Sequence, residues 1–255
     1  MFNKKYVRNS VVILIGIVFS SCATMGGPDR INNILPLDSF VYLNKSLSLK
    51  SCKAEQCVSV DIKSSASGYI VAINEEGSFV MTAAHFCEDN VPYKEVKISS
   101  SFKAKRLDGE RYDAKVLEYQ SNIDACIMFV KKLTKNVVPV KISNDRPEVG
   151  DRVYNIAAPL GIYSPNMAPI LEGRYSGEVK GFSVYSLPAA PGSSGSMILN
   201  SDGELVGMVQ AVYIRFNIIT LSIKYDDMIT YIESALKRYM SYEEDIYPLI
   251  SIDLN

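Results

Sequence analysis

From about residue 63 onward, the sequence is a succession of short apolar or alternating segments separated by tight turns. The segments "SGYIVAI" and "SFVMTAA" flank the turn "NEEG", and "SMILN" and "ELVGMVQAVY" flank "SDG". Short segments that are apolar throughout, or that alternate with a period of two residues, and that are bounded by Gly, Asn or Asp are typical of β-strands. Roughly a dozen such strands bury their apolar faces only by pairing into barrels or a sandwich. The pattern therefore predicts an all-β protein.

The order of these segments predicts two lobes. A polar stretch near residues 131–150 is interpreted as the connection between a first lobe at about 63–133 and a second at about 147–224. Residues 22–62 carry few strong signals. We interpret them as a tether and N-terminal extension, with a strand or two that close the first lobe. Residues 241–255 are too short for a further domain and are interpreted as a C-terminal tail.

One helix is predicted at residues 225–240, after the last strand. Apolar side chains recur there at three- and four-residue spacing and fall on one face. They are Met228, Ile229, Ile232, Ala235, Leu236 and Tyr239. Two aspartates near the start and Lys237 and Arg238 near the end match the helix dipole.

The N-terminus resembles a secretory leader rather than a folded element. Lys4, Lys5 and Arg8 precede the uncharged run "NSVVILIGIVFSSC", which is short for a membrane span. The small residues before Cys22 resemble the lipobox of bacterial lipoproteins, although Phe19 replaces the usual leucine. We expect a signal peptide at 1–21 and a lipid on Cys22 that anchors the protein in the bacterial cell envelope, in the periplasm or at the cell surface. A plain signal peptide and an uncleaved anchor are the alternatives.

The stretch "APGSSGSMIL" at residues 190–199 is a candidate nucleophile turn. A serine hydroxyl attacks a carbonyl only when a base lies at hydrogen-bond distance and donors hold the oxyanion that forms. In the Gly-x-Ser-Gly sequence, Gly192 allows its own N–H and that of Ser194 to point into one small pocket. We therefore predict Ser194 as the nucleophile and the N–H groups of Gly192 and Ser194 as the oxyanion hole, with Ser193 and Ser196 as bystanders.

His85 is the only histidine in the chain, so a proton shuttle that uses imidazole must use this residue. Asp124 stands at the entrance to the apolar segment "ACIMFV". A carboxylate there can accept from one ring nitrogen of the histidine and turn the other nitrogen toward the serine. The serine turn and His85, each taken alone, are better explained by an ordinary loop or core position, but their combination with Asp124 in the order His85, Asp124, Ser194 predicts a catalytic triad.

That order also excludes other types of site. An α/β-hydrolase needs Gly-x-Ser-x-Gly, which Ser196 violates, and a histidine after the serine, and a subtilisin-type site places the aspartate first on an α/β scaffold. No cysteine lies in an oxyanion-type turn. One histidine with scattered carboxylates gives no ligand cluster, so no metal or other cofactor is expected. The 27 basic and 28 acidic side chains nearly cancel, and nothing in this balance indicates a nucleic-acid partner.

The segments "TAAH", "DACIMFV" and "PGSSGSMIL", in that order, resemble the three catalytic segments of chymotrypsin-like serine peptidases, and most closely those of the bacterial HtrA/Deg branch. The similarity covers roughly residues 64–240. It implies two perpendicular six-stranded β-barrels, with His85 and Asp124 from the first barrel and Ser194 from the second meeting in the cleft between them.

Three departures from the family pattern bear on activity. Ser193 replaces the Asn of the HtrA branch and the Asp of the trypsin branch, so activation through an Asp paired with a new N-terminus is not expected. Ser196 replaces the usual second glycine, which makes the loop stiffer. The residues that follow Ser194 are too few for a PDZ domain, so we expect a protease domain without one.

Four cysteines besides Cys22 allow three disulfide pairings, or four free thiols. Cys52 and Cys57 in "SCKAEQC" are spaced to close a small loop, which would leave Cys87 and Cys126 to pair. The family geometry favours this second bridge, because these two cysteines lie two residues beyond His85 and Asp124, which touch in a working triad.

The resemblance implies a serine endopeptidase that acts on protein or peptide substrates through an acyl-enzyme. In the family, the base of the primary pocket lies six residues before the nucleophile, where this chain has Pro188, followed by Ala189. No carboxylate is present there, so we expect a small or medium apolar residue before the cleaved bond. Val209, Gln210 and Ala211 are predicted to form the facing wall. The alternative is an inert or latent binding or scaffold lipoprotein that keeps the fold. The oligomeric state is not indicated.

Overall fold

The computed structural model describes residues 34–53, 56–89, 97–213 and 216–240. The predicted signal peptide at 1–21, the predicted lipidation site Cys22 and the predicted tail at 241–255 lie outside the described residues.

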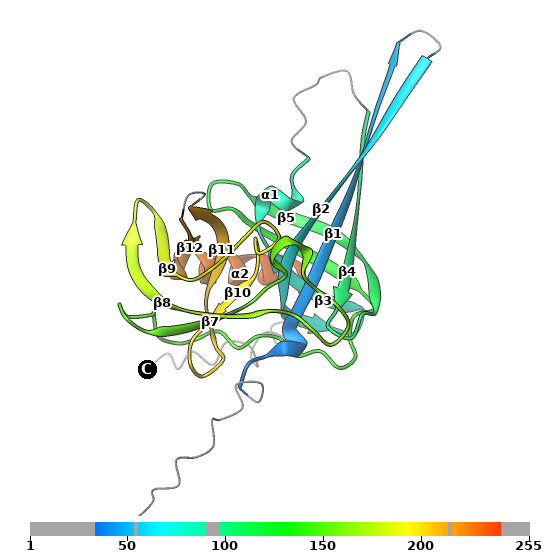
Figure 1. Ribbon diagram of the computed structural model, residues 1–255. Coiled ribbons are helices and arrows are strands. Elements are labelled where there is room, and N and C mark those ends of the chain that lie inside the picture. Colours follow the sequence, from blue (N-terminus) through cyan, green and yellow to red (C-terminus); the bar gives the residue numbers. More distant parts are fainter. Residues whose placement is uncertain (1–33, 54–55, 90–96, 214–215, 241–255) are drawn as a thin grey trace, which may run out of the picture.

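The first half of the described chain forms a closed antiparallel barrel in the strand order β1-β2-β3-β6-β5-β4 (Figure 1). The 3-10 helix η2 precedes it, and the short helix α1 follows β3. The elements are η2 (Leu37–Ser39), β1 (Phe40–Lys53), β2 (Gln56–Asn74), β3 (Gly77–Thr82), α1 (Ala84–Cys87), β4 (Lys97–Arg106), β5 (Arg111–Gln120) and β6 (Ala125–Lys131).

The second half forms another closed barrel, in the order β10-β11-β12-β9-β8-β7. Its elements are β7 (Arg152–Ile156), the 3-10 helix η3 (Pro159–Gly161), β8 (Ile170–Val179), β9 (Phe182–Ser186), β10 (Met197–Leu199), β11 (Leu205–Tyr213) and β12 (Phe216–Ser222). The predicted all-β fold with two six-stranded barrels is confirmed.

The predicted C-terminal helix is also confirmed, as α2 (Tyr225–Tyr239). Its apolar face, which includes Met228, Ile232 and Leu236, is buried. The helix packs against β6 of the first barrel and β11 of the second, so it joins the two barrels.

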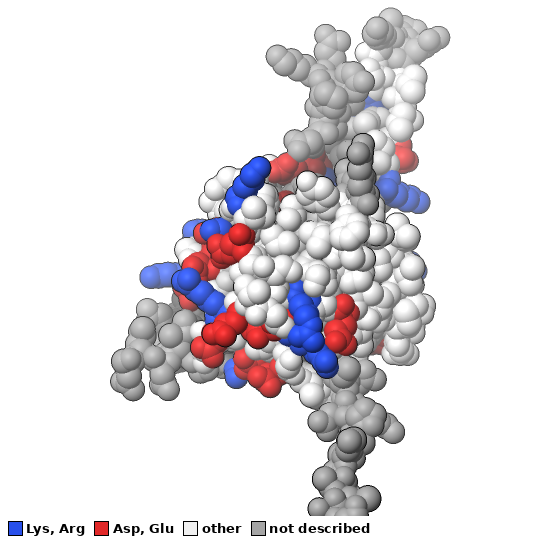
Figure 2. All heavy atoms as spheres, turned by 60° about the vertical axis from the view of Figure 1, so that its left-hand side comes forward, with Lys and Arg blue, Asp and Glu red and all other residues white. Residues whose placement is uncertain are grey.

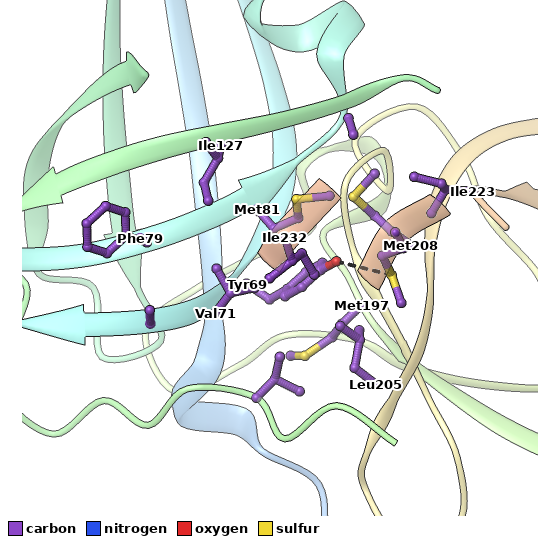
Figure 3. Packing of buried hydrophobic residues seen from close by; sticks show 14 of the residues in the cluster. Tyr69, Val71, Phe79, Met81, Ile127, Met197, Leu205, Met208, Ile223 and Ile232 are labelled. Atoms are coloured by element: carbon purple, nitrogen blue, oxygen red, sulfur yellow. Dashed lines mark hydrogen bonds between the residues drawn. The ribbon is translucent and has the colours of Figure 1, made fainter. Parts of the chain in front are cut away.

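An apolar core lies between the barrels (Figure 3). It combines side chains from both barrels with side chains from α2, and the Tyr69 hydroxyl donates a hydrogen bond to the Met228 sulfur at 3.7 Å. The labelled members are Tyr69, Val71, Phe79, Met81, Ile127, Met197, Leu205, Met208, Ile223 and Ile232. Both barrels contribute apolar side chains to this core. Burial of these side chains therefore stabilises each barrel and also fixes the position of one barrel relative to the other.

Strands β1 and β2 continue well beyond the first barrel as a projecting hairpin (Figure 1). Near the barrel, Phe40, Val41 and Leu43 are fully buried, whereas further out Val58 and Val60 are exposed. The first barrel therefore begins at Phe40, and the boundary expected near residue 63 falls within β2. The outer part of the hairpin is solvated, so its sequence lacks the apolar run that marks a buried strand.

Acidic and basic side chains are interspersed on the face of the molecule shown in Figure 2. Ion pairs on the surface of the described residues include those of Arg152 with Glu172 and of Lys224 with Glu178.

Candidate active site

His85 is positioned by its buried neighbours. It lies on α1, directly after β3, and Ala84, Phe86 and Cys87 of the same helix are buried while half of the His85 side chain is exposed. The short helix is thus fixed on the first barrel, and the imidazole ring remains accessible to a ligand.

Asp124 holds the imidazole ring from the turn that leads into β6. Its carboxylate accepts hydrogen bonds from the His85 main-chain N–H at 2.9 Å and from Nδ1 of the ring, with 2.9 Å to the nearer oxygen. Asp124 adopts a left-handed backbone conformation, with φ of 48°, which is uncommon for a residue other than glycine. Such strain persists where the surrounding structure requires it, and here it accompanies the contact between the carboxylate and His85.

This contact changes the proton affinity of His85. The hydrogen bond to Asp124 raises the pKa of the imidazole above its ordinary value of 6.5, desolvation opposes the increase, and the negative charges of Asp124 and Glu88 add to it. Since Nδ1 is engaged by the carboxylate, Nε2 is the ring nitrogen that remains to exchange protons with a substrate or a nucleophile.

A disulfide between Cys87 and Cys126 lies beside the His85–Asp124 pair. The two Cα atoms are 6.6 Å apart, and both residues are buried. Cys52 and Cys57 also form a bridge, directly opposite each other near the end of the projecting hairpin, with Cα atoms 4.1 Å apart. Both expected bridges are therefore present, and the first ties the helix that carries His85 to the strand that follows Asp124.

The N–H groups of the predicted oxyanion hole differ from the other N–H groups of their turn in their hydrogen bonding. The intervening N–H of Ser193 donates to Ala190 at 2.9 Å, and those of Gly195 and Ser196 donate to Val209 and Ser193 at 2.7 and 3.0 Å. Among the described residues, the N–H groups of Gly192 and Ser194 have no acceptor within the protein. They are the two donors in this stretch that remain available to a bound oxygen atom.

Two glycines allow the turn to pack closely against its surroundings. Gly192 and Gly195 have φ values of 98° and 79°. A Cβ atom on Gly192 would lie 2.5 Å from the Ala158 carbonyl oxygen, and one on Gly195 would lie 2.5 Å from the Ser67 carbonyl oxygen. Both positions therefore require glycine for conformation and for space.

Ser194 is half-buried in this turn, and its carbonyl accepts a hydrogen bond from the Ser67 N–H at 3.0 Å. Within the described parts of the chain, no hydrogen bond joins its hydroxyl to His85. The structure thus brings His85 and Asp124 into direct contact, and it ties the turn that carries Ser194 to the first barrel through the main chain.

The two serines that depart from the family pattern have structural partners. The fully buried Ser196 hydroxyl accepts a hydrogen bond from Asn155 Nδ2 at 2.7 Å, and that nitrogen also donates to the Met197 carbonyl at 2.7 Å. The hydroxyl of buried Ser193 accepts from the Ala190 N–H at 3.3 Å. Asn155 was missed at the level of sequence, and the signal was a polar residue within the apolar segment "VYNIAAP".

The predicted pocket residues differ in their burial and in their hydrogen-bond partners. Val209 adjoins the nucleophile turn, because its carbonyl accepts from Gly195 and its N–H donates to Ser196. Ala189 is buried, and Pro188 and Ala211 are exposed. The Gln210 side chain reaches the first barrel, where Nε2 donates to the Ile123 carbonyl beside Asp124. Gln210 therefore connects β11 to the turn that holds His85, a role that sequence reasoning missed.

No group of three or more His, Cys, Asp or Glu side chains that could hold a metal ion occurs in the described part of the chain. In that same part, no helix is both long enough and apolar enough to cross a membrane.

Comparison with known proteins agrees with the fold. The chain belongs to the family described as trypsin-like peptidase domain, which it matches over residues 66–208. The residues matched include His85, Asp124 and Ser194.

Relatives among curated proteins include bacterial proteases of the HtrA/DegP type. One is the probable periplasmic serine endoprotease DegP-like of Buchnera aphidicola subsp. Schizaphis graminum, 28% identical over 153 residues, which are 58% of this chain and 30% of the relative. The probable periplasmic serine endoprotease DegP-like of Chlamydia muridarum is 26% identical over 152 residues, or 57% of this chain and 28% of the relative. The chain thus spans about three tenths of the length of these relatives.

Proposed function

We propose that this member of the trypsin-like family is a serine endopeptidase that uses His85, Asp124 and Ser194 as its triad. The observation that carries the proposal is the double hydrogen bond from the only histidine to Asp124, through its main-chain N–H and Nδ1. This arrangement leaves Nε2 to act as the base. The two N–H groups of the nucleophile turn that have no acceptor among the described residues support the proposal independently.

The proposed reaction has two stages. Ser194 Oγ bonds to the peptide carbonyl carbon while its proton passes to His85 Nε2, and the N–H groups of Gly192 and Ser194 hold the oxyanion. The C–N bond then breaks, and His85 returns the proton to the leaving amine. Water attacks the acyl-enzyme with His85 as base, the ester bond breaks, and the proton returns to Ser194 Oγ.

A fluorophosphonate probe tests the nucleophile directly. We expect the probe to label the wild-type protein and the Ser193→Ala variant, because Ser193 is buried and bonded within the turn. Labelling is lost in Ser194→Ala. A folded wild-type protein that neither reacts with the probe nor cleaves an unstructured protein substrate would support the inert binding or scaffold function instead.

We further propose that the residue before the cleaved bond is small or medium and apolar. Pro188 and Ala189 supply no carboxylate to pair with Lys or Arg, and Gln210 is engaged with Ile123. Profiling with a peptide library checks this preference, and selective cleavage after Lys or Arg would contradict it.

We propose that the protease domain resides in the bacterial cell envelope, anchored by a lipid on Cys22. The relatives are named periplasmic, and two disulfides suit an oxidising compartment. Metabolic labelling with palmitate tests the anchor. We expect incorporation that Cys22→Ala abolishes, and an unlabelled wild-type protein in the soluble fraction would contradict the anchor.

A further inference from the structure

Ser67, on β2 of the first barrel, is fully buried and bonds to two separate loops of the second barrel. Its hydroxyl accepts a hydrogen bond from the Ala158 N–H at 2.9 Å and donates one to the Gly192 carbonyl at 2.9 Å. Its main-chain N–H donates to the Ser194 carbonyl at 3.0 Å. One residue of the first barrel therefore contacts both residues whose N–H groups form the proposed oxyanion hole.

The peptide group between Gly192 and Ser193 is held at both ends. Ser67 bonds its carbonyl oxygen, and its N–H donates to the Ala190 carbonyl at 2.9 Å. A peptide group is planar, and its C=O and N–H point in opposite directions, so these two bonds fix its rotation about the chain. A rotation would break both bonds and change ψ of Gly192 and φ of Ser193, the two angles that join this peptide group to the neighbouring peptide groups, which carry the N–H groups of Gly192 and Ser194.

The peptide groups that carry the two proposed donors also have bonded carbonyls. The Pro191 carbonyl accepts from the Leu160 N–H at 2.6 Å, and the Ser193 carbonyl accepts from the Ser196 N–H at 3.0 Å. Leu160 lies on η3, which begins directly after Ala158, the residue bonded by Ser67. Ser67 therefore links the loop that orients the Gly192 N–H to the turn that contains it.

We propose that Ser67 is a positioning residue for the oxyanion hole, through which the first barrel sets the geometry of the donors on the second. The assignment rests on the proposed peptidase function. Loss of the hydroxyl would leave the Ala158 N–H and the Gly192 carbonyl without their partner. The turn would then relax, and the N–H groups of Gly192 and Ser194 would move away from the developing negative charge, which they stabilise only when correctly aimed.

The test compares Ser67→Ala with Ser78→Ala. Ser78 is a matched control, because it is a fully buried serine of the same barrel whose hydroxyl bonds a main-chain carbonyl, that of Leu133, away from the nucleophile turn. With a peptide substrate, we expect Ser67→Ala to lower kcat by about 10- to 100-fold with little change in KM, whereas Ser78→Ala retains kcat. Ser67→Cys fills the same space with a weak hydrogen-bonding group, so a similar fall is expected if the alanine variant does not fold.

A peptidyl trifluoromethyl ketone supplies a readout that a purely structural role would not change. The ketone forms a hemiketal with Ser194, and ¹³C NMR of the labelled carbonyl carbon follows ionisation of its oxyanion. We expect this ionisation to move to higher pH in Ser67→Ala and Ser67→Cys, but not in Ser78→Ala. Retention of kcat within threefold in Ser67→Ala and Ser67→Cys, or an equal loss in Ser78→Ala, would overturn the proposal. A wild-type protein that neither cleaves peptides nor forms the hemiketal contradicts the peptidase function itself, and the role of Ser67 then falls with it.

Discussion

The two barrels share one strand order, but they hold their predicted catalytic residues by different means. The first barrel fixes His85 and Asp124 to each other through side-chain hydrogen bonds, with the Cys87–Cys126 bridge beside them. The second barrel holds the turn around Ser194 through main-chain hydrogen bonds and two glycines with positive φ, Gly192 and Gly195. The comparison teaches that a base needs an oriented side chain, whereas an oxyanion hole needs an oriented main chain.

Removal of one predicted catalytic residue from each barrel should have the largest effect. We expect His85→Ala and Ser194→Ala each to lower kcat/KM by about 10⁴-fold or more, because each step of the proposed reaction needs both groups. The double variant should be no less active than either single variant, since the groups act as a unit. Steady-state kinetics with a fluorogenic peptide measures this, and additive losses would indicate that the barrels act independently.

Gly192→Ala tests whether activity depends on the main-chain conformation of the turn around Ser194 in the second barrel. The added Cβ would lie 2.5 Å from the Ala158 carbonyl oxygen, so the turn must shift, and we expect kcat to fall by about 10²- to 10³-fold. Gly150→Ala is a matched control, because Gly150 also has a positive φ, of 101°, but a Cβ there meets nothing within 4 Å. Equal loss of activity in both variants would mean that backbone strain, and not the collision, is responsible.

Removing each disulfide in turn compares how much a cross-link in the interior of the first barrel and one in its projecting hairpin contribute to stability. From the sequence separations of 39 and 5, loop-closure entropy predicts that replacing both cysteines by alanine costs about 4 kcal/mol for Cys87–Cys126 and about 2 kcal/mol for Cys52–Cys57. Urea unfolding measures the difference. The inner pair should also affect kcat, because it adjoins His85 and Asp124. A larger effect of the hairpin pair on either quantity would contradict this ranking.

A change of pH should have the smallest effect on kcat/KM of the changes considered. Asp124 raises the pKa of His85, so the acidic limb of kcat/KM should lie above pH 6.5, the ordinary value, because the reaction needs the neutral ring. In Asp124→Asn, the limb of the residual activity should move to lower pH.

The same pKa shift also affects the stability of the fold, which it favours at low pH, whereas activity is favoured at higher pH. The stabilisation from the protonated His85–Asp124 pair is fully present below pH 6.5 and is lost as the pH rises through the higher pKa of the folded state. Thermal unfolding across this range measures it. An acidic limb of activity at or below pH 6.5 would show that desolvation of the ring outweighs the carboxylate.

Much of the fold could be predicted from local pattern. Continuous apolar runs such as 69–73 and 125–130 indicate strands buried on both faces, and the spacing of Met228, Ile232 and Leu236 indicates a helix buried on one face. The solvated hairpin was recognised only in part. Its outer residues bury little, so burial leaves no clear period in the sequence there.

The sequence by itself determined which residues are available for the chemistry: one histidine, an aspartate before an apolar strand, and a Gly-x-Ser-Gly turn. Tertiary structure alone decided how they are held. Ser67 contacts Gly192 across 125 residues of sequence, Asn155 contacts Ser196 across 41, and Gln210 contacts Ile123 across 87. Such contacts leave no local period or motif. Those of Ser67 and Gln210 depend on how the two barrels pack against each other, and that of Asn155 depends on the pairing of β7 with β10 within the second barrel.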